Sequence, residues 1–456
     1  MAVNDSGDSA YQVGTLRYTL PRLLLVCACM LLATQSLALL SNHLVPSLQP
    51  VLLDRAGASA KVIALVIGTL PYIFNFVLNP LISTCSDKTR TRYGRRMPYL
   101  LWSAPVMAGL LVALAWSGEI AALLGRILPG VDVARLRLGV LVTIVLSFSI
   151  VYLFPGTIVY YLIADVVPQN CLIKYMSFSS FCATGLTFLF NYFILELAVN
   201  RMKPTMCIIG GLYLLVYIGL FYLVREGQYP PVKDKIDRKN GKLRTAVEYF
   251  TMFFRQCFRH RIFVFLFIAV GLNQASTICR GMFNVLFATK DLQMTVGQYG
   301  QVIGYGALAS ALIVLPMGRV MSRFHPIYLY FIGGIIVMTT NVFGFFFVRS
   351  YESFFVVGIA MTIVYTIQNL AWSPMGIALM PRDKYGQFCS AQGMVVSLAL
   401  CVGSYLGGVL TDIFGYRVMF AWDFVVTTMA MASLMVVMRE WRKFGGKDAY
   451  QPPPTD

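Results

Sequence analysis

Long apolar runs recur along the whole chain and constrain its fold more than any other feature. A helix needs about 20 apolar residues to cross about 30 Å of hydrocarbon. The residues are 58% hydrophobic and 12% charged, with a mean hydropathy of +0.69, well away from an ordinary soluble domain. We therefore expect an all-α polytopic membrane protein, held in the lipid bilayer of a plasma membrane or bacterial inner membrane.

Twelve segments along the chain are apolar and long enough to be transmembrane helices. They lie at about residues 20–42, 59–85, 98–117, 138–166, 171–198, 204–224, 262–288, 298–318, 326–348, 353–380, 385–410 and 416–438. Most of the 37 lysines and arginines fall between them on a single side of the membrane. Short basic loops stay in the cytoplasm, so we expect both termini to be cytoplasmic. The same bias accounts for the net charge of +17, and we expect no nucleic-acid partner.

The chain lacks the residue patterns that are typical of enzymes and metal sites. Its ten cysteines form no CxxC pair and fall mostly in apolar runs, where they act as small hydrophobic side chains. The three histidines, His43, His260 and His325, lie in predicted loops or at helix ends. We expect no catalysis, no metal and no cofactor.

A basic segment joins the second and third apolar runs, from Pro80 to Pro98. It holds one carboxylate and five cations, a charge density that lipid cannot solvate. The cations are Lys88, Arg90, Arg92, Arg95 and Arg96. The pair Asp87-Lys88, followed by Gly94-Arg95-Arg96, resembles the signature loop of the major facilitator superfamily. Its longer spacing more closely resembles the glycoside–pentoside–hexuronide cation symporter branch.

The chain also repeats itself, which agrees with this resemblance. Pro80 precedes Asp87 by seven residues in the second helix, and Pro316 precedes Arg323 by seven in the eighth. The resemblance implies the major facilitator fold, with two pseudo-symmetric six-helix bundles. We expect a tail at 1–19, bundles at 20–224 and 261–438, a linker at 225–260 and a tail at 439–456. The linker's pattern of Phe and Arg predicts an amphipathic helix at the membrane surface.

Polar side chains recur on single faces of four expected helices. The resemblance implies that the first, fourth, seventh and tenth helices line a central cavity, and these four carry the stripes. The candidate cavity residues are Gln35, Tyr152, Tyr160, Asn273, Gln274, Thr277, Arg280, Asn284, Tyr365, Gln368, Asn369 and Trp372. Aromatic rings beside amides suit a sugar, whose C–H groups stack while its hydroxyls form hydrogen bonds. The rival interpretation is hydrogen bonding between packed helices, at about 1 kcal/mol per bond.

Arg280 is the one cation that lies away from the ends of an expected span, and an unpaired guanidinium at that depth costs a few kcal/mol. It must therefore meet a carboxylate, an anionic substrate or water. Glu196 is our preferred partner, because the fifth helix should face the second half, and Asp423 and Asp291 are alternatives. Contact with the substrate would favour an acidic sugar.

The coupling ion is where the resemblance weakens. The symporter branch carries acidic residues one turn apart before a proline in the second helix, and here Asn75 and Asn79 occupy those places. Neutral amides cannot compensate the charge of sodium or carry a proton. Either Asp165 or Glu196 carries a proton, or the protein is a facilitator.

By resemblance, the basic segment forms an inner gate. Asp87 would dock near the start of the eleventh helix, and Arg95 or Arg96 would meet Asp165. The gating set is Asp87, Lys88, Gly94, Arg95, Arg96 and Asp165, with Arg382 and Asp383 at the end of the tenth helix. We expect a monomeric secondary transporter that moves a small polar solute (a sugar, glycoside or sugar acid) by alternating access. Alternatives are a facilitator or exporter of another organic solute, or a receptor without net flux.

Overall fold

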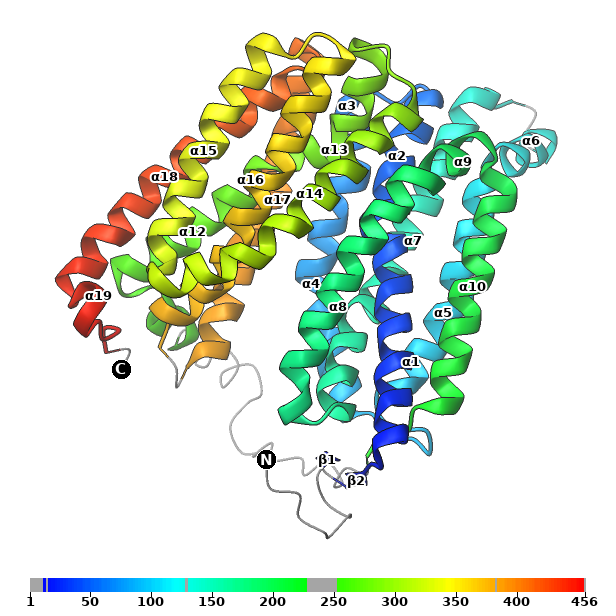
Figure 1. Cartoon of the computed structure of the whole chain (residues 1–456). Helices are drawn as coiled ribbons and strands as arrows, with labels where there is room; N and C mark the ends of the chain where they lie inside the picture. Colours follow the sequence, from blue (N-terminus) through cyan, green and yellow to red (C-terminus); the bar gives the residue numbers. More distant parts are fainter. Residues whose placement is uncertain (1–10, 14, 128–129, 228–251, 382–383, 455–456) are drawn as a thin grey trace. The chain divides into compact units, whose positions relative to one another are not determined.

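The structure is a computed structural model that describes residues 11–13, 15–127, 130–227, 252–381 and 384–454 (Figure 1). A few side chains within described helices, including those of Asp87 and Lys88, lie outside the description. Helices make up nearly all of it, as the all-α fold class predicted. The one strand pair in the described ranges is a short antiparallel hairpin of β1 (Gln12–Val13) and β2 (Leu16–Arg17).

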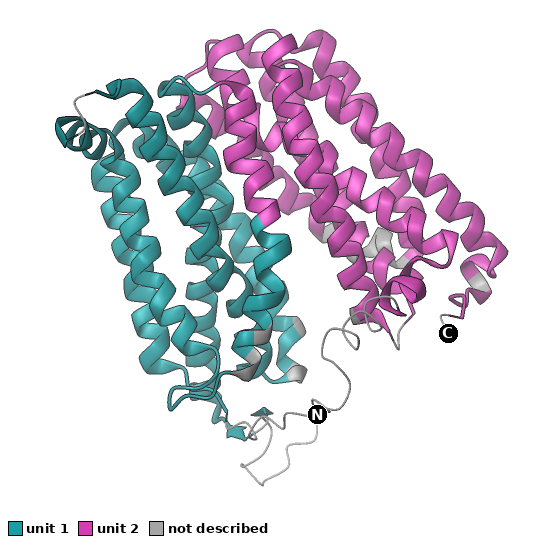
Figure 2. Cartoon of the chain, turned by 180° about the vertical axis from the view of Figure 1, so that it is seen from behind, with its two compact units in different colours: residues 1–58, 74–233 teal, residues 59–73, 234–456 magenta. Residues whose placement is uncertain are grey.

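The chain divides into two compact units, coloured separately in Figure 2. Unit 1 comprises residues 1–58 and 74–233, and unit 2 comprises residues 59–73 and 234–456. The helices that lie in unit 1 are α1 (Leu20–Ala38), η1 (Leu39–Leu44), α2 (Val45–Arg55), most of α4 (Leu70–Lys88), α5 (Met97–Ala115), α6 (Ser117–Ile127), α7 (Val133–Val166), α8 (Gln169–Leu189), η3 (Phe190–Ile194), α9 (Leu195–Asn200) and α10 (Met202–Leu223), where η marks a π-helical turn.

Unit 2 begins with residues 59–73, the first part of the second expected span, and continues after the linker. Its helices are α3 (Ala60–Ala64), η2 (Leu65–Thr69), the first turn of α4, α12 (Arg261–Ser276), α13 (Ile278–Leu286), η4 (Phe287–Asp291), α14 (Val296–Arg323), α15 (Pro326–Phe347), α16 (Tyr351–Leu379), α17 (Tyr385–Phe414), α18 (Val418–Lys443) and α19 (Gly446–Ala449). The expected linker falls mostly on residues 228–251, outside the described residues. Residues 252–258, near its end, are helical, and the amphipathic character of the whole segment stays a prediction.

Within the described residues, eleven helical segments are long and apolar enough to cross a membrane. Helix α14 is not among them, but its 28 residues occupy the place of the expected eighth span. The polytopic all-α prediction is therefore confirmed. Large apolar side chains on the outside, such as Phe343 and Phe347 on α15, are more than half exposed, as lipid-facing residues should be.

The first span is longer than the sequence predicted. Helical structure continues from Leu20 to Arg55 instead of ending near residue 42. Pro46 lacks the N–H that would continue an α-helical ladder, and the π-helical turn η1 lies directly before it. The wider turn changes the hydrogen-bond register, with Val45 donating to the carbonyl of Leu40, and the helix resumes.

Helix α6 is a further difference, because residues 118–137 were expected to form a loop. It is amphipathic and short, with Glu119 in its first turn and Arg126 in its last. These charges suit the positive and negative ends of the helix dipole. A search for 20-residue apolar runs cannot detect such a helix.

The first part of the second span, residues 59–73, packs closely on α17 inside unit 2. A Cβ placed at Gly68 would lie 2.6 Å from Ser404 Cβ, and one at Gly408 would lie 2.4 Å from Ala64 Cβ. The hydroxyls of Thr69 and Ser404 are hydrogen-bonded at 2.9 Å. Small residues let two helices approach this closely where apolar lipid provides no hydrophobic drive.

We expect Gly408→Ala to destabilise the protein by about 1–3 kcal/mol, because the added methyl group overlaps Ala64 and the backbone of Ala60. Gly393→Ala is the matched control, since it lies on the same helix with nothing within 4 Å of an added Cβ. Thermal melting in detergent measures both. Equal melting temperatures for the two variants would refute the close-packing interpretation.

Candidate functional site

The basic segment folds onto the end of α7 within unit 1. Arg95 Nη2 lies 2.7 Å from Asp165 Oδ1 and 2.9 Å from Oδ2, while its Nε donates to Oδ2 at 3.2 Å. Arg96 Nε approaches Asp165 Oδ2 at 3.3 Å, and its Nη1 donates to Ser86 at 2.5 Å. A bidentate arginine–carboxylate pair of this kind fixes the orientation of the two side chains and also stabilises the contact. The predicted contact of Arg95 or Arg96 with Asp165 is therefore present.

Glu226, just after α10, completes this site, and the sequence analysis did not identify it. Its carboxylate accepts hydrogen bonds from the backbone N–H groups of Arg95, Arg96 and Met97, at 2.7–2.8 Å. These groups open α5 and would otherwise lack partners. Burial raises the pKa of Glu226, although the three backbone donors act to lower it.

Gly94 is the turn that makes this cap possible. Its φ of +109° is a conformation that side chains with a Cβ rarely adopt. A Cβ there would also lie 2.5 Å from the carboxyl carbon of Glu226. Glycine is therefore required both by the backbone and by the close approach of the cap.

The remaining gating residues fall outside the part of the chain that the structure describes. The side chains of Asp87 and Lys88 are not described, and neither are Arg382 and Asp383. The docking of Asp87 on the eleventh helix therefore stays a prediction.

The predicted polar stripe of the seventh span lies at a break in the helix. Helix α12 ends at Ser276 and α13 begins at Ile278, with Thr277 between them. The Ala275 carbonyl accepts a hydrogen bond from Trp422 Nε1 on α18, at 2.9 Å. Thr277 itself donates to the Gln274 carbonyl at 3.1 Å. Side chains thus replace part of the backbone ladder at the break.

Two of the expected cavity residues bond to each other instead. Gln368 Nε2 donates to Asn273 Oδ1 at 2.9 Å, and the two residues are 1% and 4% exposed. Each satisfies the other across α12 and α16, so the interhelical interpretation describes this pair. On the same helices, Gln274 and Trp372 are half-buried and Asn369 is exposed.

Arg280 pairs with Asp423 on α18, so the preference for Glu196 was wrong. Its Nη2 lies 3.4 Å from Asp423 Oδ2 and 2.6 Å from Asn341 Oδ1. Asp423 is fully buried and also accepts from Tyr365, and from Thr427 at 3.2 Å. Helices α12 and α13 both pack on α18, which brings Asp423 within reach of Arg280.

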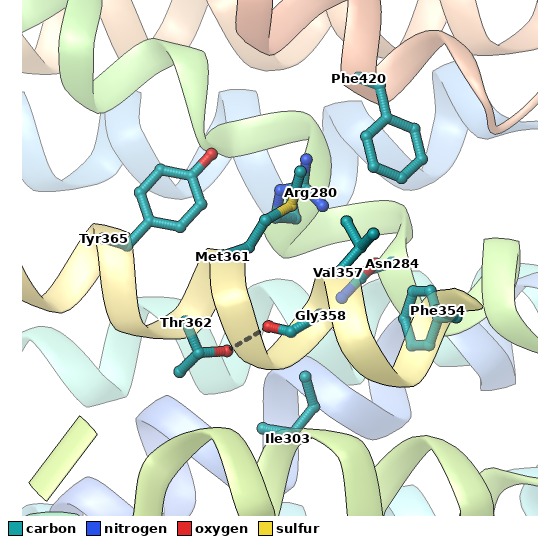
Figure 3. A pocket seen from close by; sticks show the side chains of 10 residues that line it. All are labelled: Arg280, Asn284, Ile303, Phe354, Val357, Gly358, Met361, Thr362, Tyr365 and Phe420. Atoms are coloured by element: carbon teal, nitrogen blue, oxygen red, sulfur yellow. Dashed lines mark hydrogen bonds between the residues drawn. The ribbon is translucent and has the colours of Figure 1, made fainter. Parts of the chain in front are cut away.

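A small cavity of about 80 Å³ adjoins this pair (Figure 3). Arg280 and Asn284 border it from α13, and Tyr365 borders it from α16. Two buried atoms in its lining have no hydrogen-bond partner among the described residues: Arg280 Nε, a donor, and Asn284 Oδ1, an acceptor. The rest of the lining is mostly apolar, with Phe420 lying against the guanidinium at 4.9 Å.

The polar residues expected in the first half lie within unit 1. Gln35 Nε2 donates to the carbonyl and hydroxyl of Ser179 at 3.1 Å, and its buried Oε1 has no partner in the described part of the chain. Asn79 accepts from Thr157 at 2.8 Å. Asn75 and Tyr152 are half-buried, whereas Tyr160 is 58% exposed and Glu196 is exposed.

Two further polar contacts were not identified from the sequence. Asn341 lies in an apolar run of α15, where its amide gave no periodic pattern. Asp412 accepts from the N–H groups of Ala60 at 2.7 Å and Lys61 at 2.9 Å. Only its place at the end of a span could have suggested a helix cap.

The chain matches the profile of the MFS/sugar transport protein family over residues 37–440. The chain belongs to this family. The resemblance to the major facilitator superfamily is therefore confirmed, and the protein is an integral multi-pass membrane protein of a transport family. Comparison with curated protein sequences finds no match.

Solved structures with the same fold include three kinds of transporter. A bacterial homolog of the human lysosomal transporter Spinster, inward-facing and unoccupied, has a TM-score of 0.66 at 14% identity, covering 95% of this chain and 98% of that one. The nucleoside transporter NupG gives 0.61 at 14% identity, over 92% and 98%. A D-xylose-proton symporter gives 0.62 at 15% identity, over 90% and 96%. At these identities the likeness establishes the fold.

We expect Glu226→Ala to destabilise the protein by about 1–3 kcal/mol, because three backbone donors at the start of α5 lose their acceptor. Glu119→Ala is the control: Glu119 forms an exposed ion pair with Lys203 in the same unit and should change the melting temperature little. The melting temperatures of the two purified variants test this expectation. An equal, small effect of both substitutions would show that the cap adds no stability.

Proposed function

We propose that this protein is a secondary transporter that moves a neutral, hydroxyl-rich solute, a sugar or glycoside, by alternating access. Membership of the MFS/sugar transport protein family supports transport and a sugar-like solute. The observation that indicates a neutral solute is the pairing of Arg280 with Asp423.

Charge balance argues against an acidic sugar at this site. An unpaired Arg280 would attract a carboxylate, but Asp423 already compensates its charge. A second carboxylate would have to displace Asp423, and leaving that group buried and unpaired costs about 3–5 kcal/mol. A neutral solute avoids this cost.

The unpartnered atoms point to a hydroxyl group. Arg280 Nε can only donate, and Asn284 Oδ1 can only accept. A hydroxyl does both, whereas a carboxylate can satisfy the arginine alone. The cavity of about 80 Å³ has room for one hydroxyl-bearing group of a sugar, or for two or three waters at about 30 Å³ each.

Alternating access is the mode of transport we propose, with both termini in the cytoplasm and a monomer as the working unit. The contacts of Arg95 and Arg96 with Asp165 would then close the inner side and break when it opens. Asn79 is neutral and hydrogen-bonded to Thr157, which disfavours sodium at the usual place for this branch. A facilitator remains the second candidate, favoured by those same neutral amides.

Thermal-shift measurements on purified protein test the solute class. We expect D-xylose, D-glucose or methyl β-D-glucoside to raise the melting temperature, and D-glucuronate to do so less. Asn284→Leu should abolish the shift, because it removes the acceptor and fills the cavity.

Gly393→Ala, on an open face of α17, is the control and should keep the shift. Uptake of the stabilising sugar into proteoliposomes then separates a transporter from a receptor. Stabilisation by D-glucuronate alone would reverse the assignment of solute class. Binding without uptake would replace transport by a receptor function.

A further inference from the structure

Asp423 is a fully buried carboxylate in a span of the protein, which demands an explanation beyond packing. Replacing a buried ion pair with apolar side chains is often neutral or stabilising, so stability alone does not account for it. Ionisable groups inside membrane spans commonly mark pathways for ions or protons.

The carboxylate is held by donors from three helices. Arg280 on α13 and Tyr365 on α16 both approach Oδ2, and Thr427 on its own helix approaches Oδ1. The titratable groups that face the pair are Cys279 on α13, Tyr365 on α16 and, on the side of Arg280, Tyr299 on α14. Among the described residues, the groups that α12 and α15 present to Asp423 are neutral: Ser276 and Asn341.

A second position is available to the Arg280 guanidinium, beside Asn284. Its bond to Asp423 is long, at 3.4 Å, and its Nε lacks a partner although it is buried. Asn284 Oδ1, one turn further along α13, is a buried acceptor without a donor and borders the same cavity. A guanidinium turned away from Asp423 would therefore meet an acceptor and space for water.

We propose that Asp423 is the proton-binding site of this transporter and that Arg280 is its movable counter-charge. A proton from water on one side of the membrane binds a carboxylate oxygen of Asp423 and makes it neutral. Arg280 keeps its own proton, loses the attraction of the carboxylate and turns towards Asn284. Release of the same proton to water on the other side restores the ion pair, so no other bond changes.

This inference rests on the proposed transport function for its coupling role, but proton binding can be measured without any solute. Infrared difference spectra between acidic and alkaline pH detect the C=O stretch of a protonated carboxyl. We expect wild-type protein to show a band that is missing in Asp423→Asn and kept in Glu119→Gln, whose carboxyl is exposed. An unchanged spectrum in Asp423→Asn overturns the proposal.

Where the Asp423→Asn variant does not fold, Arg280→Gln is introduced in the same protein. The double variant removes both charges, which is milder than leaving one of them buried and unpaired. Its spectrum is interpreted in the same way, and cooperative melting confirms that it is folded.

Proteoliposomes test the coupling, with methyl β-D-glucoside as the starting probe. One imposed pH unit should drive about tenfold accumulation by wild-type protein if one proton moves with each solute. The Asp423 variants should still exchange the glucoside at equal concentrations but show an accumulation ratio near one. Accumulation by a variant to the wild-type level refutes coupling at Asp423. A wild-type protein that exchanges no sugar refutes the proposed function instead, while the infrared result is unaffected.

Discussion

The absence of water in a bilayer is the constraint on which the rest of this structure depends. Every polar group inside a span must find its partner in the protein, and the described helices show this repeatedly. Gln368 is hydrogen-bonded to Asn273, and Arg280 is paired with Asp423. Near the break at Thr277, the Ala275 carbonyl accepts a hydrogen bond from Trp422. The few buried polar atoms left without partners are therefore informative, and two of them border one cavity.

The same reasoning applies where the chain leaves the membrane. At the end of unit 1 that carries the basic segment, two arginines share one aspartate and a single glutamate caps the start of α5. The charges there hold a loop in one conformation, in contrast to the exposed ion pair of Glu119 and Lys203. Burial and shared partners, more than the number of ion pairs, determine what such contacts can do.

Hydropathy and charge were sufficient to predict the helical membrane fold, because lipid imposes a length and a composition on each span. Periodicity also showed that Arg280, Asn284 and Thr277 lie near one another on the seventh span, and that Arg280 needs a partner. It could not identify that partner, since a periodic pattern defines a face of one helix but not the helix that this face meets. Glu226 was missed for a related reason: a carboxylate in a polar linker has no pattern that predicts the backbone it caps. The bundle boundaries and the docking of Asp87 stay predictions.

The break at Thr277 has a mechanical consequence. Because the backbone ladder is interrupted there, α12 and α13 can change their mutual angle with little loss of hydrogen bonding. Trp422 on α18 bonds to Ala275 on the α12 side of the break, while the next residue, Asp423, pairs with Arg280 on the α13 side. A change in the angle between α12 and α13 would therefore act on two adjacent residues of α18, which couples bending of the span to the state of its buried charge.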